Sequence, residues 1–122
     1  MPEILLIDDD PAQLCVREAV LRQAGFSVST AATASAAQQQ LRNSSIASAV
    51  RLIITDHMMP GVSGYVFVRE LRKLSPNIPV IVISGLAEAE EEYAGLNVTF
   101  LNKPCEPEEL IETVRSLAQG NV

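Results

Sequence analysis

The sequence predicts one α/β domain in which five strands and five helices alternate and the strands form a parallel sheet. Short runs rich in Ile and Val recur five times with little polar alternation, as in strands buried on both faces of a sheet. An amphipathic segment follows each run, and this order predicts helices on both faces, joined by right-handed crossovers. With 122 residues, 48% of them hydrophobic, the chain is long and apolar enough for one core.

The predicted strands coincide with the five apolar runs. They are EILLI, FSVSTA, RLIIT, PVIVI and VTFL, at residues 3–7, 26–31, 51–55, 79–83 and 98–101. None of these runs is long enough to span a membrane. The start of the chain also lacks the basic and apolar regions of a signal peptide.

The first predicted helix follows directly after the first strand. Asp10 is a plausible N-cap, Pro11 suits the first helical position and Gly25 suits the end of the helix. We therefore expect Asp10 to cap this helix rather than to bind a metal. The predicted inward stripe of the helix consists of Val16, Val20, Leu21 and Ala24.

Four further helices are predicted, one after each of the remaining strands. Thr33 or Ser35 opens the second helix. The fourth is short and acidic, spans residues 86–95, and is expected to present a solvated face. Residues 43–50 carry the weakest pattern and predict a surface loop. The inward residues are Phe67, Leu71 and Leu74 in the third helix, and Leu110, Val114 and Leu117 in the fifth.

Charge and cysteine content exclude several classes of protein. The formal net charge is -6, and the sequence has no basic stripe or zinc-finger spacing, so no direct nucleic-acid partner is expected. No membrane partner is expected either. Cys15 and Cys105 lie far apart without a CxxC spacing, which predicts two free thiols in a reducing cytoplasm.

Polar residues stand at the carboxyl ends of four predicted strands. They are Asp8, Asp9 and Asp10 after the first strand, Asp56 after the third, Ser84 after the fourth and Lys103 after the fifth. Ligands bind at this edge of an open parallel sheet, where the strand order reverses. Clustered carboxylates suit Mg²⁺, and carboxylate, metal, hydroxyl and lysine together suit phosphoryl transfer. The pattern therefore predicts a phosphoryl-transfer site.

Four motifs in this order, LLIDDDPAQL, IITDHMMPGVSG, VIVISG and FLNKP, resemble the receiver domain of two-component response regulators. The resemblance covers Glu3 to about Leu117. It implies a flavodoxin-like, doubly wound (βα)5 fold with strand order 2-1-3-4-5 and helices on both faces. We expect a receiver domain over residues 1–122, with a core of about 3–119 and no output domain in the chain.

The resemblance assigns a phosphoacceptor and a metal site. Asp56 matches the residue that takes a phosphoryl group from a phosphohistidine donor. Asp9 and Asp56 match direct ligands of Mg²⁺, for which Mn²⁺ is a possible substitute. Asp8 matches a ligand that acts through water, and the backbone carbonyl of Met58 matches a further ligand.

The resemblance also assigns the residues that respond to phosphorylation. Lys103 matches the lysine that pairs with the acceptor and then with the phosphoryl group. Ser84 matches the hydroxyl that moves toward the phosphoryl oxygens, and Phe100 matches the switch aromatic, without the hydroxyl of the commoner tyrosine. Pro104 matches a proline whose peptide bond with the preceding lysine is cis.

Partners follow from the same resemblance. The implied donor is a histidine kinase or a histidine phosphotransfer protein. A downstream protein partner is expected at the face of the fourth helix, fifth strand and fifth helix, and a phosphorylation-dependent dimer is possible. The segment between Ser84 and Lys103 is shorter than the family pattern, which affects this face. The domain is expected to catalyse its own phosphorylation and dephosphorylation only, without a turnover substrate.

Several alternatives stay open. A non-phosphorylated adaptor could share the fold, although ionised residues at apolar strand ends are costly unless they are paired or ligated. The chain could stand alone or be a receiver module of a larger regulator or hybrid histidine kinase. A small phosphatase would need a cap over its substrate, and a flavin-binding domain would need a phosphate loop that is not acidic. His57, the only histidine, is expected to be an exposed loop residue.

Overall fold

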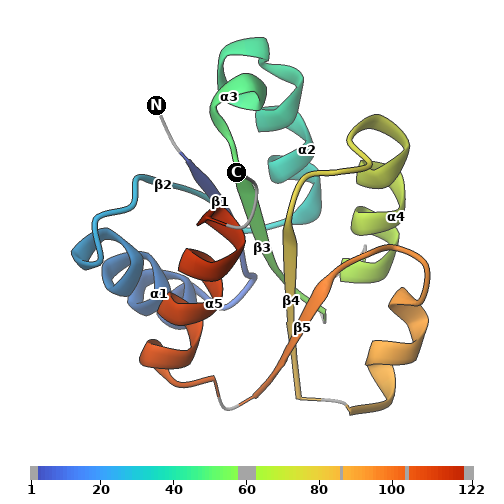
Figure 1. The fold of residues 1–122 in the computed structure, drawn as a ribbon. Helices are drawn as coiled ribbons and strands as arrows, with labels where there is room; N and C mark the ends of the chain where they lie inside the picture. Colours follow the sequence, from blue (N-terminus) through green and yellow to red (C-terminus); the bar gives the residue numbers. More distant parts are fainter. Residues whose placement is uncertain (1–2, 58–62, 86, 104, 120–122) are drawn as a thin grey trace.

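The computed structural model describes residues 3–57, 63–85, 87–103 and 105–119. Five parallel strands form one sheet in the order β2-β1-β3-β4-β5 (Figure 1). The predicted strand order is therefore confirmed, and each strand lies within two residues of its predicted bounds. The strands are β1 (Ile4–Ile7), β2 (Val28–Ala31), β3 (Leu52–Asp56), β4 (Val80–Ser84) and β5 (Thr99–Asn102).

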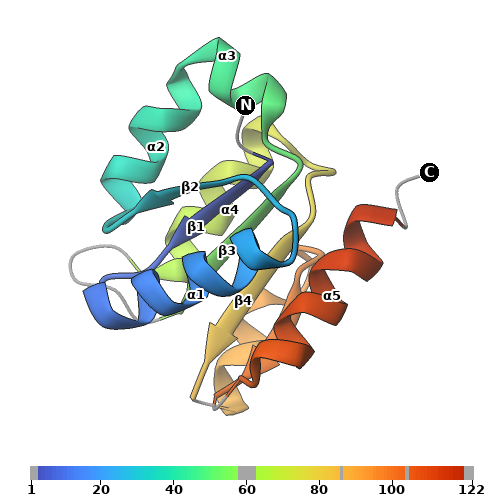
Figure 2. The same ribbon diagram turned by 90° about the vertical axis from the view of Figure 1, so that its left-hand side faces the viewer.

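Helices cover both faces of this sheet, as the alternating sequence pattern predicts. They are α1 (Pro11–Gln23), α2 (Ala34–Arg42), α3 (Ser44–Ala49), α4 (Gly64–Leu74), the 3₁₀ helix η1 (Ala87–Tyr93) and α5 (Pro107–Gln119). Helices α1 and α5 lie side by side on one face (Figure 2), and α2 and α4 lie on the other. No helix in the described ranges is long and apolar enough to cross a membrane.

The core has two layers because successive strand residues point to opposite faces. In β1, Leu5 and Ile7 pack toward α2 and α4, whereas Ile4 and Leu6 pack toward α1 and α5. Burial on both faces explains why the three central strands, β1, β3 and β4, carry continuous apolar runs. The helices contribute a few large apolar residues to each layer, among them Phe67, Leu71, Leu110 and Val114.

The predicted N-caps are present at two helices. The Asp10 carboxylate accepts hydrogen bonds from the backbone N–H groups of Ala12 and Gln13, so its predicted role as a cap is confirmed. The hydroxyl of Thr33, rather than that of Ser35, accepts the bond that begins α2.

Two predicted core positions are wrong. Val16 is 60% exposed and Leu74 is 86% exposed. The inward face of α1 instead runs through Leu14, Arg17 and Leu21, because Arg17 occupies a position at which the apolar pattern expects a hydrocarbon side chain. Leu74 is the last residue of α4, so it lies beyond the part of the helix that packs on the sheet.

Residues 43–50 do not form the predicted loop. They contain α3, a short helix whose N-cap is Asn43, with a side chain that accepts from the N–H groups of Ser45 and Ile46. Its six residues include a single large apolar side chain, Ile46, which is too little for a periodic signal. The predicted acidic helix is present as the 3₁₀ helix η1.

Candidate phosphoryl-transfer site

Three carboxylates meet at the carboxyl edge of the sheet. Asp8 follows β1 and is fully buried, and Asp56 ends β3 and is 3% exposed. These strands are neighbours, with Ile7 paired to Thr55, so the two carboxylates come together. With exposed Asp9, they offer oxygen atoms that all lie within 4.8 Å of one another. The structure thus brings together the acidic residues that the sequence singled out.

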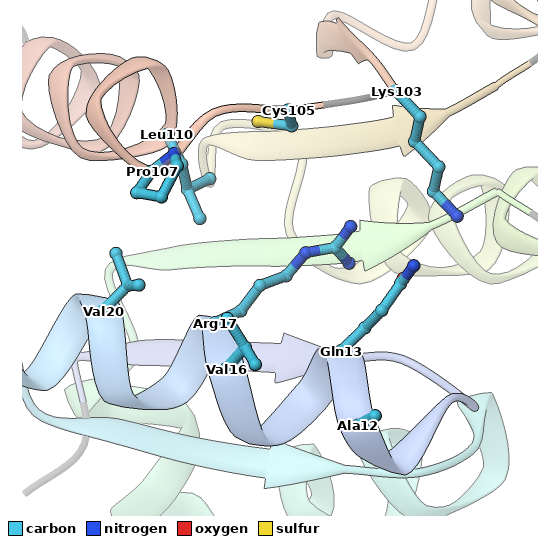
Figure 3. A pocket seen from close by; sticks show the side chains of 9 residues that line it. All are labelled: Ala12, Gln13, Val16, Arg17, Val20, Lys103, Cys105, Pro107 and Leu110. Carbon is cyan, nitrogen blue, oxygen red and sulfur yellow. The ribbon is translucent and has the colours of Figure 1, made fainter.

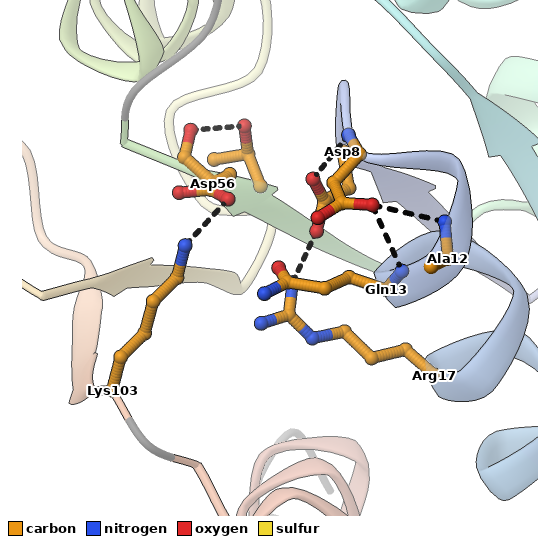
Figure 4. Close-up of polar contacts among 8 residues, drawn as sticks. Asp8, Ala12, Gln13, Arg17, Asp56 and Lys103 are labelled. Carbon is orange, nitrogen blue, oxygen red and sulfur yellow. Dashed lines mark hydrogen bonds and ion pairs between the residues drawn. The ribbon is translucent and has the colours of Figure 1, made fainter.

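A positively charged side chain contacts each of the two buried carboxylates (Figure 4). Lys103 Nζ lies 2.9 Å from Asp56 Oδ2. The guanidinium of Arg17 lies 2.6 Å from Asp8 Oδ2. The other Asp8 oxygen accepts the backbone N–H of Asp10 at 2.9 Å. The lysine was predicted for this site, whereas Arg17 was not, because its only signal in the sequence is its spacing from Leu14 and Leu21.

The electrostatics of the acidic residues favour a bound cation. Burial raises the pKa of the Asp8 carboxyl, and the negative charge of Asp56 adds to this effect. The Asp10 N–H lowers this pKa, as do the positive charges of Arg17 and Lys103. Mutual repulsion among ionised carboxylates is relieved by a hard cation, and carboxylate oxygens are the ligands that Mg²⁺ prefers. The donor set therefore fits this metal.

The remaining predicted residues divide into two groups. Ser84 is buried at the end of β4, and its carbonyl accepts the Lys103 N–H at 2.8 Å, so both stand next to Asp56. Phe100 is half-buried on β5 and packs against the layer beneath α2 and α4. The predictions for Met58 and Pro104 lie outside the described residues.

Comparison with known proteins identifies the chain's family. The family model for the response regulator receiver domain matches residues 4–115. The chain belongs to the response regulator receiver domain family. The domain is 33% identical over 120 residues to the hydrogenase transcriptional regulatory protein HoxA of Bradyrhizobium diazoefficiens. That match covers 95% of this chain and 24% of HoxA, so the chain spans about a quarter of that relative's length.

Solved structures agree with this receiver fold. Chemotaxis protein CheY4 of Vibrio cholerae matches with a TM-score of 0.84 and 27% identity, covering 96% of this chain and 98% of that chain. The signal receiver domain of a histidine kinase from Syntrophus aciditrophicus matches with a TM-score of 0.85 and 27% identity, covering 98% and 92%. The receiver architecture is therefore shared by proteins of different size and output.

His57 of the receiver domain is buried, and the prediction of an exposed loop histidine is wrong. Only 5% of it is exposed, and its Nδ1 atom lies 2.7 Å from the Tyr93 hydroxyl. Burial raises the pKa of Tyr93 above its usual range, so this hydroxyl keeps its proton. Tyr93 also contacts Phe100, with ring centroids 6.1 Å apart. Tyr93 thereby connects η1 to the residue that follows Asp56.

We expect Tyr93→Phe to lower the free energy of unfolding by about 1.5 kcal/mol, because it leaves a buried His57 nitrogen without its partner. Urea denaturation measures the change. Tyr65→Phe is the matched control, since half-buried Tyr65 contacts Tyr93 through its ring, and its effect should stay below about 0.5 kcal/mol. Equal losses in the two variants would contradict a special role for the Tyr93 hydroxyl.

Proposed function

We propose that this receiver domain takes a phosphoryl group onto Asp56 from a phosphohistidine donor in a Mg²⁺-dependent reaction. The main support is the position of the Asp56 carboxylate, which is almost fully buried, contacts Lys103 and lies beside two further carboxylates. A buried carboxylate of this kind is costly unless it is paired or ligated. An accessible lysine and a metal site at the same carboxylate suit phosphoryl transfer.

Each residue has a defined part in the proposed transfer. An Asp56 oxygen forms a bond to phosphorus while the bond between phosphorus and the histidine nitrogen breaks, and that nitrogen keeps the electron pair. Lys103 is close enough to Asp56 to neutralise the oxygens of the incoming group. Asp8, Asp9 and Asp56 would hold Mg²⁺ (or Mn²⁺), together with the Met58 carbonyl. The metal, when bound, spreads the negative charge of the transferring group.

Phosphorylation is proposed to act on a protein surface. Ser84 would turn toward the phosphoryl oxygens, and Phe100 would adjust next to it. A downstream protein would then bind one state of the face formed by η1, β5 and α5, and a phosphorylation-dependent dimer could use the same face. The contact between Phe100 and Tyr93 supports an effect of phosphorylation on this face, because it joins β5 to η1.

The proposed partners are a histidine kinase or a histidine phosphotransfer protein as donor. HoxA is a transcriptional regulatory protein by name, and we propose that this domain belongs to a comparable regulatory pathway, alone or as a module of a larger regulator. It would catalyse only its own phosphorylation and dephosphorylation. A cytoplasmic location is proposed, in agreement with the free thiols of Cys15 and Cys105.

Intact-protein mass spectrometry tests the proposal. Incubation with acetyl phosphate and Mg²⁺ should add one phosphoryl group, which is absent without Mg²⁺ and in Asp56→Asn. A phosphorylated histidine phosphotransfer protein should label the chain faster. If neither donor labels the wild-type protein although it binds Mg²⁺, the adaptor alternative is favoured.

A further inference from the structure

The ion pair between Arg17 and Asp8 is buried, although one partner comes from the middle of a helix. Only 13% of the Arg17 side chain and none of the Asp8 side chain are exposed, and the distance is 2.6 Å. The pair between Arg22 and Glu18 on the same helix is different, because 53% of the Arg22 side chain and 33% of the Glu18 side chain are exposed. Buried ion pairs carry far larger desolvation costs than surface pairs and depend strongly on both partners.

Arg17 completes the pairing of Asp8 in the absence of a metal. One Asp8 oxygen accepts the Asp10 N–H and the other accepts the guanidinium, so both oxygens are engaged. Without Arg17, a fully buried carboxylate would keep a single backbone hydrogen bond. The arginine therefore stabilises the acidic residues by themselves, a task that a bound cation could also perform.

The positive charge of Arg17 also opposes the binding of a metal ion at this site. The formal charges of Asp8, Asp9 and Asp56 are negative. Positively charged Arg17 contacts Asp8, and positively charged Lys103 contacts Asp56. A divalent cation must bind against the repulsion of both positive side chains. Lys103 is already assigned to the phosphoryl group, which leaves Arg17 with no part in the proposed transfer.

The surroundings give the guanidinium room and another acceptor. Arg17 and Lys103 line a cavity of about 590 Å³ between α1 and α5, with the polar ends of Gln13, Arg17 and Lys103 toward one end of it (Figure 3). Gln13 lies beside Arg17 (Figure 4), and its Oε1 atom is buried without a hydrogen-bond partner in the described part of the chain. Arg17 can therefore shift away from Asp8 without losing every acceptor.

We propose that Arg17 is a positioning residue that stabilises the metal-free site through Asp8 and thereby weakens its affinity for Mg²⁺. This inference rests on the proposed function, since it assumes the metal site formed by Asp8, Asp9 and Asp56. It shifts phosphoryl uptake to higher Mg²⁺ concentrations than the carboxylates alone would need. Arg17 and a bound Mg²⁺ ion compete for the same buried carboxylate, that of Asp8.

Magnesium binding to the unphosphorylated chain tests this inference. Calorimetric titration compares wild type with Arg17→Gln, which removes the charge but keeps a hydrogen-bond donor. We expect Arg17→Gln to bind Mg²⁺ about tenfold more tightly. Its melting temperature should be lower without Mg²⁺ and should rise more when Mg²⁺ is added.

Two control variants show whether the change in Mg²⁺ affinity comes from the charge of Arg17 or from the loss of any positive charge on α1. Arg22→Gln removes the same charge from an exposed position of α1 and should leave the affinity unchanged. Arg17→Lys keeps the charge and should bind Mg²⁺ much as wild type does. Unchanged affinity in Arg17→Gln would overturn the inference, and so would a variant that stays unfolded at every Mg²⁺ concentration. Absence of Mg²⁺ binding by wild type would instead overturn the metal site of the proposed function.

Discussion

Lys103→Met is expected to slow phosphoryl uptake at Asp56 by at least about a hundredfold, the effect of removing one charged group that faces a reacting oxygen. The ammonium lies 2.9 Å from Asp56 Oδ2, so it is in reach of the oxygens of a group bonded to that carboxylate. Methionine keeps the unbranched stem but carries no charge. Intact-protein mass spectrometry during incubation with acetyl phosphate and Mg²⁺ gives the rate.

Lys73→Met is the matched control for Lys103→Met. Lys73 is an exposed lysine of α4 that contacts Glu70 at 3.4 Å. Replacing it with methionine changes the net charge by the same amount as Lys103→Met does. Its rate of phosphoryl uptake should equal that of wild type. Circular dichroism with Mg²⁺ present checks that the Lys103 variant is folded. A folded Lys103→Met protein that is labelled at the wild-type rate would contradict a role for this lysine in the transfer.

Gly64→Ala is expected to lower the free energy of unfolding by about 3 kcal/mol, because the first residue of α4 has no room for a side chain. A Cβ atom at Gly64 would lie 2.6 Å from the Asp56 carbonyl oxygen and 2.9 Å from the Tyr93 hydroxyl. The Gly64 N–H also donates to the His57 carbonyl at 2.8 Å, which fixes α4 against the end of β3. Urea denaturation measures the loss.

Gly85→Ala provides the comparison for Gly64→Ala. Within the described ranges, a Cβ atom at Gly85 would meet only the Lys103 Cβ atom, at an ordinary contact distance of 3.9 Å. Its effect on the free energy of unfolding should stay within about 0.5 kcal/mol. If alanine is tolerated equally well at both positions, the close approach of α4 to β3 is not a constraint on the sequence.

The sheet could be predicted from the sequence because its signal is strong and local. Strands such as β3 and β4 are buried on both faces, so they appear as unbroken apolar runs. Helix faces were harder to predict, since a periodic pattern counts only apolar residues. Val16 fits the period yet is exposed, whereas Arg17 faces inward because its charge is met by a buried carboxylate.

The meeting of the acidic residues could be predicted from the strand order, whereas the contacts that support the site could not. Asp8 and Asp56 stand at the ends of adjacent parallel strands, so their meeting follows from the strand order. The bond between His57 and Tyr93 joins residues 36 positions apart in the sequence. Tyr93 lies in none of the four motifs, and the motif that contains His57 does not name its partner. Their pairing depends on how η1 packs against β3, which no local pattern in the sequence records.

Reductive trapping would test most directly whether Asp56 accepts the phosphoryl group. Borohydride converts an aspartyl phosphate to homoserine, which peptide sequencing by mass spectrometry then locates in the chain. After incubation with acetyl phosphate and Mg²⁺, we expect homoserine in place of Asp56 alone, and none when Mg²⁺ is withheld. Homoserine at Asp8 or Asp9 with Asp56 unchanged would contradict the assignment of the phosphoacceptor.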